Sequence, residues 1–403
     1  MSVTAADAAS CALHDAGTCR SCPHLSLPMP DQLAAKQSRV AALLAEHVPA
    51  ELWQAPAASA PTGFRNKAKM AVAGTAAHPT LGILDGAGCG VDLRTCPLHV
   101  PAIEAALPVL ADLVTELGLR PYDVPARRGE LKYVLVTASP DDDLMVRFVL
   151  RSRRYLERLR AAVPDLRRRL PQLAVAAVNI QSVHQAVIEG PEEIVLTEED
   201  RLLMRLSLPS PGLGSRAGRR AESVELPLYL PTRSFFQTNT AVAEALYATA
   251  RDWAEEAEPA RVWDLFCGVG GFALALAAPG RRVLGVEVSA SAIDGARAAA
   301  DLMGLDPALV RFEAGDARVL DPAAGVRRPD LLVVNPPRRG IGEQLAGRIE
   351  ASGVERVLYS SCNPRTLATD LAHLPSMRVV RSRLFDMFPH TEHAEVLVEL
   401  VRD

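Results

Sequence analysis

The sequence lacks any apolar run long enough to cross a membrane. Its longest apolar stretches, such as Leu331–Val334, have the length of a strand, whereas a membrane-spanning helix needs about 20 apolar residues. The first ten residues also lack the basic start and the apolar middle of a secretory signal. We therefore expect a cytoplasmic protein that makes no membrane contact.

Aromatic residues are scarce, at 4% of the chain, and the formal net charge is only -4. A mildly acidic chain can still carry a local basic face, and arginines are concentrated between residues 147 and 169. Such a face would hold phosphates without reading bases, because few aromatic side chains are present for stacking. A solvated, arginine-rich helix surface explains the same stretch equally well.

The seven cysteines favour metal binding or catalysis over a disulfide framework, because a cytoplasmic chain keeps its thiols reduced. Three of them, Cys11, Cys19 and Cys22, lie close together at the start of the chain, and Cys362 lies far from them near the end. Two separate uses of cysteine are therefore expected.

Composition and pattern divide the chain into three regions. We assign residues 1–60 to a cysteine-bearing segment with a helix over Asp31–His47, residues 61–225 to a central α+β domain, and residues 226–403 to an α/β domain. Pro209–Ser223 is rich in Gly, Pro and Ser and is either a linker or, as we prefer, a long hairpin loop, since strand-like residues resume at once. The β-branched and aliphatic runs predicted as strands of the central domain are Tyr133–Thr137, Leu144–Leu150 and Val175–Gln181.

From Val262 onward, short apolar strands alternate with helices. This alternation is typical of a Rossmann-like, mostly parallel sheet with helices on both faces, which binds ligands at the carboxyl ends of its strands. The predicted strands are Val262–Phe266, Val283–Val288, Leu331–Val334, Val357–Ser360 and Val396–Val401. The predicted helices are Phe272–Ala277, Ala290–Met303, Gly342–Ser352 and Arg365–Leu374.

A glycine-rich turn, DLFCGVGGF at residues 264–272, follows the first of these strands. Glycines let the backbone approach a ligand, although a tight structural turn uses the same residues. The next strand ends near Glu287, about 20 residues beyond, where a carboxylate usually holds the ribose hydroxyls of a nucleoside. Because the turn has neither the GxGxxG spacing nor the lysine of a phosphate-binding loop, S-adenosylmethionine fits better than NAD or ATP. Asp316 either bonds the adenine amino group or is a surface turn residue.

Reactive side chains follow two further strands. Asn335 precedes two prolines, which stiffen the turn and direct its amide into the crevice, unless they only terminate the strand. Cys362 lies beside a helix start, where the dipole favours thiolate, although a lone cysteine is more often a core residue. Glu395 lies just ahead of the last strand, so Cys362 and Glu395 form a candidate pair of nucleophile and base. His390 and His393 are alternatives for the base.

Eight motifs match a known family: CALHDAGTCRSC (11–22), FRNKAKM (64–70), GELKY (129–133), SFFQTN (234–239), DLFCGVGGF (264–272), NPPRRGIG (335–342), SSCN (360–363) and LFDMFPHTEH (384–393). Over nearly its whole length the chain resembles the bacterial RNA uracil-C5-methyltransferases, and most closely those that act on 23S ribosomal RNA. The resemblance implies methyl transfer from S-adenosylmethionine to C5 of one uracil in that RNA.

The resemblance also implies roles for particular residues. Cys362 is the implied nucleophile, which adds to uracil C6, and Glu395 is the implied base, which removes the C5 proton. The expected cofactor contacts are Gln237, Phe266, Gly268, Glu287, Asp316 and Asn335. The implied ligands of a [4Fe-4S] cluster are Cys11, Cys19, Cys22 and Cys96, although four thiolates suit zinc equally and Cys89 competes as the fourth ligand. Candidate RNA contacts, which are otherwise salt-bridged surface, are Phe64, Arg65, Lys67, Lys69 and Lys132.

Other functions remain open. One alternative keeps the same chemistry and changes the substrate to transfer RNA or to two ribosomal uracils. An alternative from a different functional class is an iron-sulfur RNA-binding protein that is catalytically inactive. The NPP triplet alone suggests an amino-methyltransferase, but Arg338 stands in place of the aromatic residue of that motif. We expect no β-barrel RNA-binding domain before Cys11, so the cysteine segment and the central domain would position the RNA. We expect a monomer whose target base is unstacked or lies in a loop.

Overall fold

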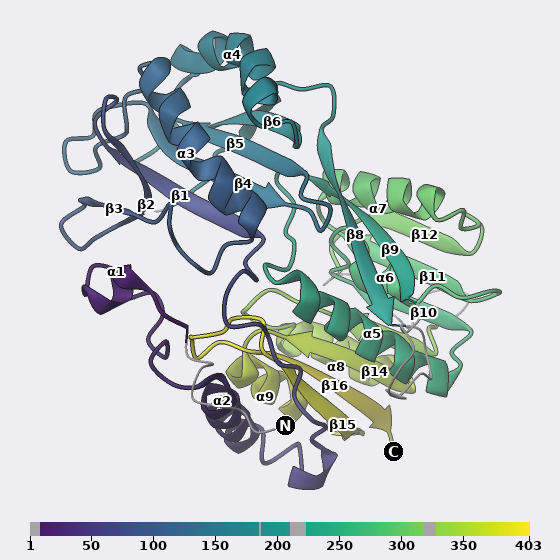
Figure 1. Ribbon diagram of the computed structural model, residues 1–403. Coiled ribbons are helices and arrows are strands. Elements are labelled where there is room, and N and C mark those ends of the chain that lie inside the picture. The colour runs from purple at the N-terminus through teal and green to yellow at the C-terminus, as the bar shows by residue number, and fades with distance from the viewer. Residues whose placement is uncertain (1–8, 185–186, 210–222, 318–327) are drawn as a thin grey trace.

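The computed structural model describes residues 9–184, 187–209, 223–317 and 328–403, and it contains two seven-stranded sheets (Figure 1). The N-terminal segment forms α1 (Ala12–Asp15), α2 (Met29–Leu43) and a short 3-10 helix, η1 (Ala50–Leu52). Helix α2 is the helix predicted over Asp31–His47. Within the described ranges, no helix is both long enough and apolar enough to span a bilayer.

The central domain is built on a mixed sheet in the order β3-β2-β1-β4-β5-β6-β7. Neighbouring strands are antiparallel except β5 and β6, which are parallel. Helices α3 (Pro101–Glu116) and α4 (Leu156–Arg169) pack on one face of it and share a single apolar core with the strands. The strands are β1 (Lys67–Gly74), β2 (Pro79–Leu84), β3 (Gly90–Asp92), β4 (Leu131–Ala138), β5 (Leu144–Leu150), β6 (Leu173–Ile180) and β7 (Glu192–Val195). The three strands predicted here are β4, β5 and β6.

The C-terminal sheet has the order β12-β11-β10-β13-β14-β16-β15. Its first five strands are parallel, and β16 is antiparallel to both β14 and β15. The strands are β10 (Arg261–Leu265), β11 (Arg282–Glu287), β12 (Val310–Ala314), β13 (Leu331–Val334), β14 (Arg356–Ser361), β15 (Met377–Phe385) and β16 (Glu395–Arg402). The five predicted strands are all present, and the sequence-based strand assignment missed β12 and β15.

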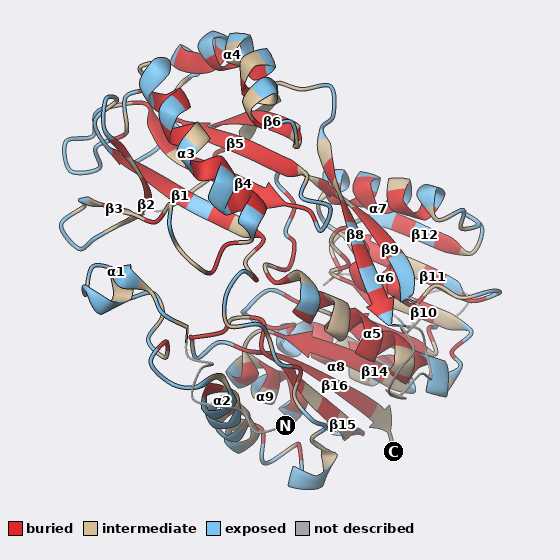
Figure 2. Cartoon of the chain, viewed as in Figure 1, coloured by how far each residue is buried: buried red, intermediate tan, exposed pale blue. Residues whose placement is uncertain are grey.

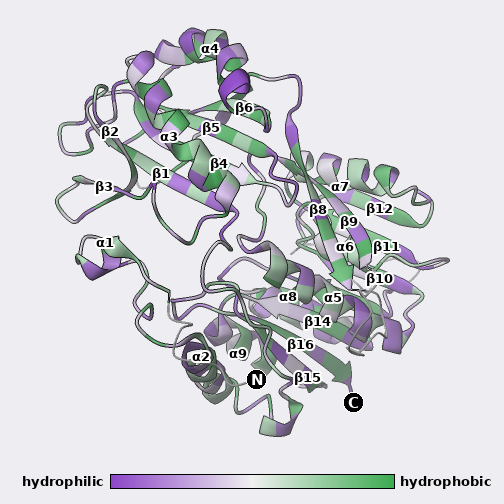
Figure 3. Cartoon of the chain, viewed as in Figure 1, coloured by the Kyte–Doolittle hydropathy of each residue, from purple (hydrophilic) through white to green (hydrophobic). Residues whose placement is uncertain are grey.

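Helices cover both faces of the C-terminal sheet, as the apolar strands predicted. On one face, α5 (Thr240–Ala257), α6 (Gly271–Ala275) and α7 (Ala290–Leu302) contribute to one core. On the other face, α8 (Gly342–Ser352) and α9 (Pro364–Ala372) form a second core, to which α2 adds Val40 and Leu44. The strands are therefore buried and apolar while the helices expose polar outer sides (Figures 2 and 3).

A hairpin of β8 (Arg201–Pro209) and β9 (Ser223–Pro231) links the two sheets. Its apolar side chains, including Leu206 and Leu228, belong to the same core as α5 and α7, so the hairpin packs with the C-terminal sheet. The predicted loop between its strands lies almost wholly at 210–222, outside the described residues, and its end residues Pro209 and Ser223 are paired across the hairpin.

Candidate active site

A cavity of about 640 Å³ lies where β10, β11, β13 and β14 end. The parallel strands point their carboxyl ends to this edge of the sheet, so the residues that follow them converge on one space. The structure brings together all eight residues predicted for catalysis and cofactor binding: the cavity is lined by Gln237, Phe266, Gly268, Glu287, Asp316, Asn335, Cys362 and Glu395.

The glycine-rich turn brings backbone close to this cavity. Phe266 and Gly268 both have positive φ angles, of 65° and 54°, so the chain turns sharply directly after β10. A Cβ at Gly271 would lie 2.4 Å from the Tyr247 hydroxyl oxygen, which leaves space only for glycine at the start of α6. The Ala273 amide donates to Asp264 Oδ2 at 2.9 Å and ties β10 to this helix, and burial raises the pKa of Asp264 to about 8.

A carboxylate and an apolar side chain lie together at the end of β11. Glu287 Oε1 accepts a hydrogen bond from the Ser289 amide at 3.0 Å, which fixes the carboxylate at the cavity edge. Val288 follows it and is 74% exposed, although it is apolar, and it lines the same cavity. A carboxylate beside an exposed apolar surface matches the ribose and base of a nucleoside.

Cys362 and Glu395 lie at the same end of the β14–β16 pair. These strands are antiparallel and pair as far as Ser361 and Val396, so Cys362 and Glu395 are the next residues beyond that pair, and both line the cavity. Burial raises the pKa of the Cys362 thiol, Glu395 raises it further, and Arg338 lowers it. Burial also raises the pKa of Glu395 to about 7, against the hydrogen bond that Ser360 Oγ donates to its Oε1 at 2.5 Å. The site therefore holds a thiol and a carboxyl that both ionise near or above neutral pH.

Asp370 anchors the loop that carries Arg338 and Arg339. Its buried carboxylate accepts the Tyr359 hydroxyl at 2.6 Å and the Ile341 and Gly342 amides at 2.9 and 3.0 Å. A Cβ at Gly340 would lie 2.2 Å from Asp370 Oδ2, so only glycine fits at this approach. The anchor fixes the two arginines at the cavity rim.

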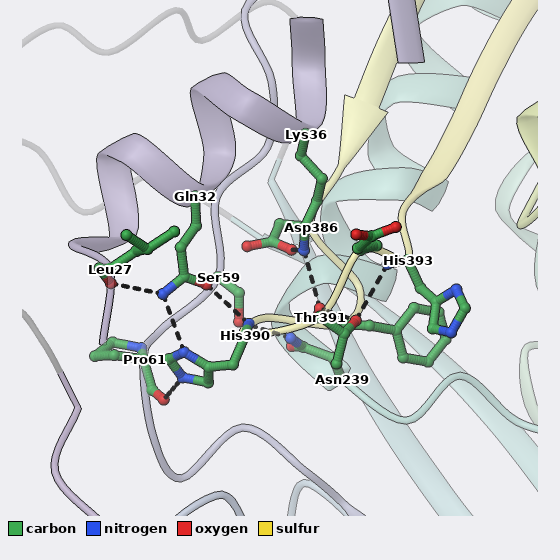
Figure 4. A network of polar contacts seen from close by, with 12 residues as sticks. Leu27, Gln32, Lys36, Ser59, Pro61, Asn239, Asp386, His390, Thr391 and His393 are labelled. Atoms are coloured by element: carbon green, nitrogen blue, oxygen red, sulfur yellow. Dashed lines mark hydrogen bonds and ion pairs between the residues drawn. The ribbon is translucent and has the colours of Figure 1, made fainter. Parts of the chain in front are cut away.

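Helix α2 holds the segment that leads into Glu395 (Figure 4). Lys36 Nζ pairs with Asp386 Oδ1 at 2.5 Å, and the two side chains are only 2% and 1% exposed. Gln32 Oε1 accepts the His390 amide at 2.9 Å, and the His390 ring contacts Gln32 Nε2 at 3.2 Å and the Pro61 carbonyl at 2.7 Å. Because a carbonyl only accepts, Nε2 of this ring carries the proton. His390 is thus a buried structural residue that does not line the cavity, whereas His393 does.

Comparison with known proteins identifies the family. The model of the tRNA (uracil-5-)-methyltransferase family matches residues 225–318 and 325–403. A 23S rRNA (uracil(747)-C(5))-methyltransferase RlmC of Halothiobacillus neapolitanus is 48% identical, over 97% of this chain and 99% of that protein. The RlmC of Cronobacter sakazakii is 47% identical, over 98% of this chain and all of that protein. The chain belongs to the RNA uracil-C5-methyltransferase family. It is an S-adenosylmethionine-dependent enzyme of that family.

A solved methyltransferase structure has the same fold as this enzyme. The Pyrococcus abyssi tRNA (uracil-54, C5)-methyltransferase, crystallised in complex with S-adenosyl-L-homocysteine, superposes with a TM-score of 0.74. The match covers 94% of this chain and 85% of that chain, at 24% sequence identity. The α/β methyltransferase fold expected from the sequence is thereby confirmed.

A second cavity, of about 160 Å³, gathers the predicted cluster ligands of the enzyme. Cys11, Cys19, Cys22 and Cys96 all line it, and Cys89 does not. Burial and, to a smaller extent, the other three thiols raise the pKa of Cys22 to about 11, against the lowering effect of Arg65. In the part of the chain that the structure describes, no group of three or more His, Cys, Asp or Glu side chains is arranged to hold a metal ion. The four thiols thus converge on a cavity without forming a closed single-ion site.

The predicted RNA contacts do not share one environment. Phe64 and Lys132 are buried, and Lys132 donates to the Val183 carbonyl at 2.7 Å. Arg65 lines the cysteine cavity, and burial lowers the pKa of Lys67 to about 8. Lys69 is exposed. RNA contact by these residues stays a prediction.

The arginines expected as a basic face are mostly engaged with carboxylates. Arg147 is buried against Glu189 and Glu193, and five further arginines of this stretch lie within ion-pair distance of carboxylates: Arg151, Arg153, Arg160, Arg168 and Arg169. This pairing favours the solvated helix surface over a phosphate-binding face.

Several lining residues were missed by sequence reasoning. Phe235 is 69% exposed at the cavity and stands two residues before Gln237, within the motif that marked that glutamine. Phe388 comes from the segment ahead of Glu395, which also carries His393, the residue already considered as an alternative base. Arg338 and Arg339 follow the two prolines after Asn335. The signal that could have identified these residues is their closeness in sequence to the residues that were predicted.

Proposed function

We propose that the enzyme transfers a methyl group from S-adenosylmethionine to C5 of a uracil in 23S ribosomal RNA, by way of a covalent adduct between Cys362 and C6. The observation that carries this proposal is that Cys362 and Glu395 lie together in the cavity that Glu287 and the glycine turn also line, close enough for Glu395 to raise the pKa of the thiol. The RNA is proposed from the two RlmC relatives, whose names specify uracil 747 of 23S rRNA.

The chemistry requires both residues because uracil C5 is a weak nucleophile. The Cys362 thiolate adds to C6, and the electrons of the C5–C6 double bond move to O4 to give an enolate with electron density at C5. S-adenosylmethionine supplies the methyl group that C5 takes up. Glu395 then accepts the C5 proton, the C5–C6 double bond re-forms, and the thiolate leaves.

The remaining lining residues are proposed to hold the cofactor. Glu287 would bond the ribose hydroxyls, and the backbone after Phe266 and at Gly268 would approach the nucleoside closely. Gln237, Asp316 and Asn335 offer polar groups around the same space. A cavity of about 640 Å³ lies within the usual range for small-molecule sites, roughly 300–1,000 Å³.

The decisive experiment uses 23S RNA that carries 5-fluorouridine. Fluorine at C5 cannot be removed as a proton, so the reaction stalls as a protein–RNA adduct that survives denaturing electrophoresis. We expect the adduct with the wild type and with the matched control Cys89→Ala, whose cysteine is exposed and outside the cavity. Cys362→Ala should form none. Methylation of unsubstituted RNA by Cys362→Ala would refute the mechanism, and adducts with transfer RNA alone would refute the substrate.

We further propose that Cys11, Cys19, Cys22 and Cys96 hold a [4Fe-4S] cluster. Thiols from two separate segments lining one cavity support this, and four thiolates are the usual ligands of such a cluster. When bound, it would cross-link the cysteine segment to the central domain. Iron and sulfide analysis with the visible absorption spectrum tests this, and one zinc per chain without iron would contradict it.

A further inference from the structure

The nucleophile of the proposed reaction needs a positive partner. Only the thiolate of Cys362 can attack C6, and both burial and the nearby Glu395 favour the neutral thiol. Charged or titratable groups line the same cavity from several elements: Glu287 after β11, Asp316 after β12, Arg338 and Arg339 after β13, and His393 and Glu395 around the start of β16. A cation among them has to offset the effects of burial and of Glu395 on the sulfur.

Arg338 is fastened to the segment that carries the nucleophile. Its carbonyl oxygen accepts a hydrogen bond from Asn363 Nδ2 at 3.0 Å and another from Thr366 Oγ1 at 3.2 Å. Asn363 is the residue that follows Cys362, and it also caps α9 by accepting the Arg365 amide. The turn after β13 and the turn after β14 therefore move as one unit.

The guanidinium of Arg338 is also oriented. Its Nη2 lies 3.2 Å from Nδ1 of His393. Burial and the nearby cations, Arg338 first among them, lower the pKa of His393, so the ring is neutral at pH 7 and Nδ1 accepts this bond. His393 packs edge-on against Phe388, which holds the ring in place. The arginine is thus fixed at its backbone from one side and at its side chain from the other.

We propose that Arg338 is the positioning residue that stabilises the Cys362 thiolate, with His393 orienting its guanidinium. This inference rests on the proposed function, because only that reaction requires the thiolate. The thiol loses its proton to solvent, and the Arg338 guanidinium in the same cavity stabilises the resulting charge. The same charge returns when the adduct breaks down. Arg339 lines the cavity as well, but within the described residues the hydrogen bonds to Asn363, Thr366 and His393 are made by Arg338.

The test measures ionisation of Cys362 without RNA. The wild type, Arg338→Met, Arg338→Lys and the control Arg365→Met are alkylated with iodoacetamide from pH 6 to pH 10, and mass spectrometry quantifies the peptide that contains Cys362. Arg365 is exposed, stands three residues after Cys362 and does not line the cavity. We expect the midpoint to rise by about one pH unit in Arg338→Met, and to stay near the wild-type value in Arg338→Lys and Arg365→Met.

A second measurement separates charge stabilisation from a structural role. The rate of adduct formation with 5-fluorouridine RNA should fall about tenfold in Arg338→Met at pH 7 and recover as the pH is raised. S-adenosylmethionine affinity, measured by calorimetry, should be retained and would show that the cavity is folded. An unchanged alkylation midpoint in Arg338→Met overturns the inference. Absence of any adduct in the wild type, with the midpoint shift present, overturns the proposed function but not the role of Arg338.

Discussion

Replacing Lys36, on α2, by Met should destabilise the enzyme more than loss of an exposed surface charge such as Arg378. The Lys36 ammonium pairs with Asp386 at 2.5 Å and donates to the Phe388 carbonyl at 2.9 Å. Asp386 Oδ2 is buried and has no hydrogen-bond partner among the described residues. Removing the ammonium leaves the carboxylate buried and without its cation, which costs about 3–5 kcal/mol.

The assay is urea unfolding followed by circular dichroism, with two comparison proteins. Arg378→Met removes an exposed ion pair to Asp403 whose partners are both 62% exposed, so it should cost less than about 1 kcal/mol. The double variant Lys36→Met with Asp386→Leu removes both buried charges and should recover most of the lost stability. The recovery separates loss of a buried charge pair from loss of packing.

The single variant Lys36→Met should also slow methyl transfer while it still binds the cofactor. The segment 386–393 carries Phe388 and His393 into the cavity and runs directly into Glu395, whereas the glycine turn lies on other strands. His390 in this segment has a φ of 62°, an unusual backbone conformation that the surrounding contacts must hold. If Lys36→Met costs less than 1 kcal/mol, or if the double variant is no more stable than the single one, the clamp by α2 is not what fixes this segment.

Three further predictions follow from the site. Ser360→Ala removes the hydrogen bond that lowers the pKa of Glu395. The acidic limb of the plot of kcat/KM against pH should therefore move to higher pH, and kcat/KM at pH 7 should fall by at most about tenfold. An acidic limb that does not move would contradict the assignment of Glu395 as the base. The pKa of Glu395, about 7 in the folded protein, lies above its unfolded value, so the contribution of this residue to folding stability is present below pH 4.5 and is lost as the pH rises through 7. Glu395→Gln should therefore be more stable than the wild type by on the order of 3 kcal/mol at pH 8 but not at pH 4.5. Urea unfolding of both proteins at the two pH values measures this difference. Cys96→Ser should lose the bound metal and unfold at a lower urea concentration, whereas Cys89→Ser should keep the metal and the stability of the wild type. If Cys89→Ser lost the metal and Cys96→Ser did not, Cys89 would be the fourth ligand in place of Cys96.

Three of the site residues could be predicted because they follow strands. Glu287, Asn335 and Cys362 come at or after the ends of parallel strands, so their convergence on one edge follows from the alternation of strands and helices alone. Strand β15 was missed because arginines at positions 378, 381 and 383 interrupt its apolar residues, and such a mixture also occurs in exposed loops.

Contacts between distant parts of the chain could not be predicted from local pattern. Gln32 and Lys36 look like ordinary polar positions of a surface helix, but both are buried against residues more than 340 positions away. The same contacts explain why His390, weighed as a base because of its neighbours in sequence, is instead a buried link between α2 and Pro61. Burial of a polar residue by a remote segment leaves no mark in its own neighbourhood.

The direction of β16 is what permits the proposed chemistry. In a wholly parallel sheet, the residue that begins a strand lies at the edge opposite to the residues that end its neighbours. Glu395 begins β16, whereas Cys362 follows the end of β14, and they share an edge only because β16 runs antiparallel to β14. Strand β15, which pairs with β16 along its other side, and the segment 386–393 deliver the chain back to that edge. The antiparallel pair therefore adds the proposed base to the proposed cofactor-binding edge, which parallel strands alone would supply only with residues from their carboxyl ends.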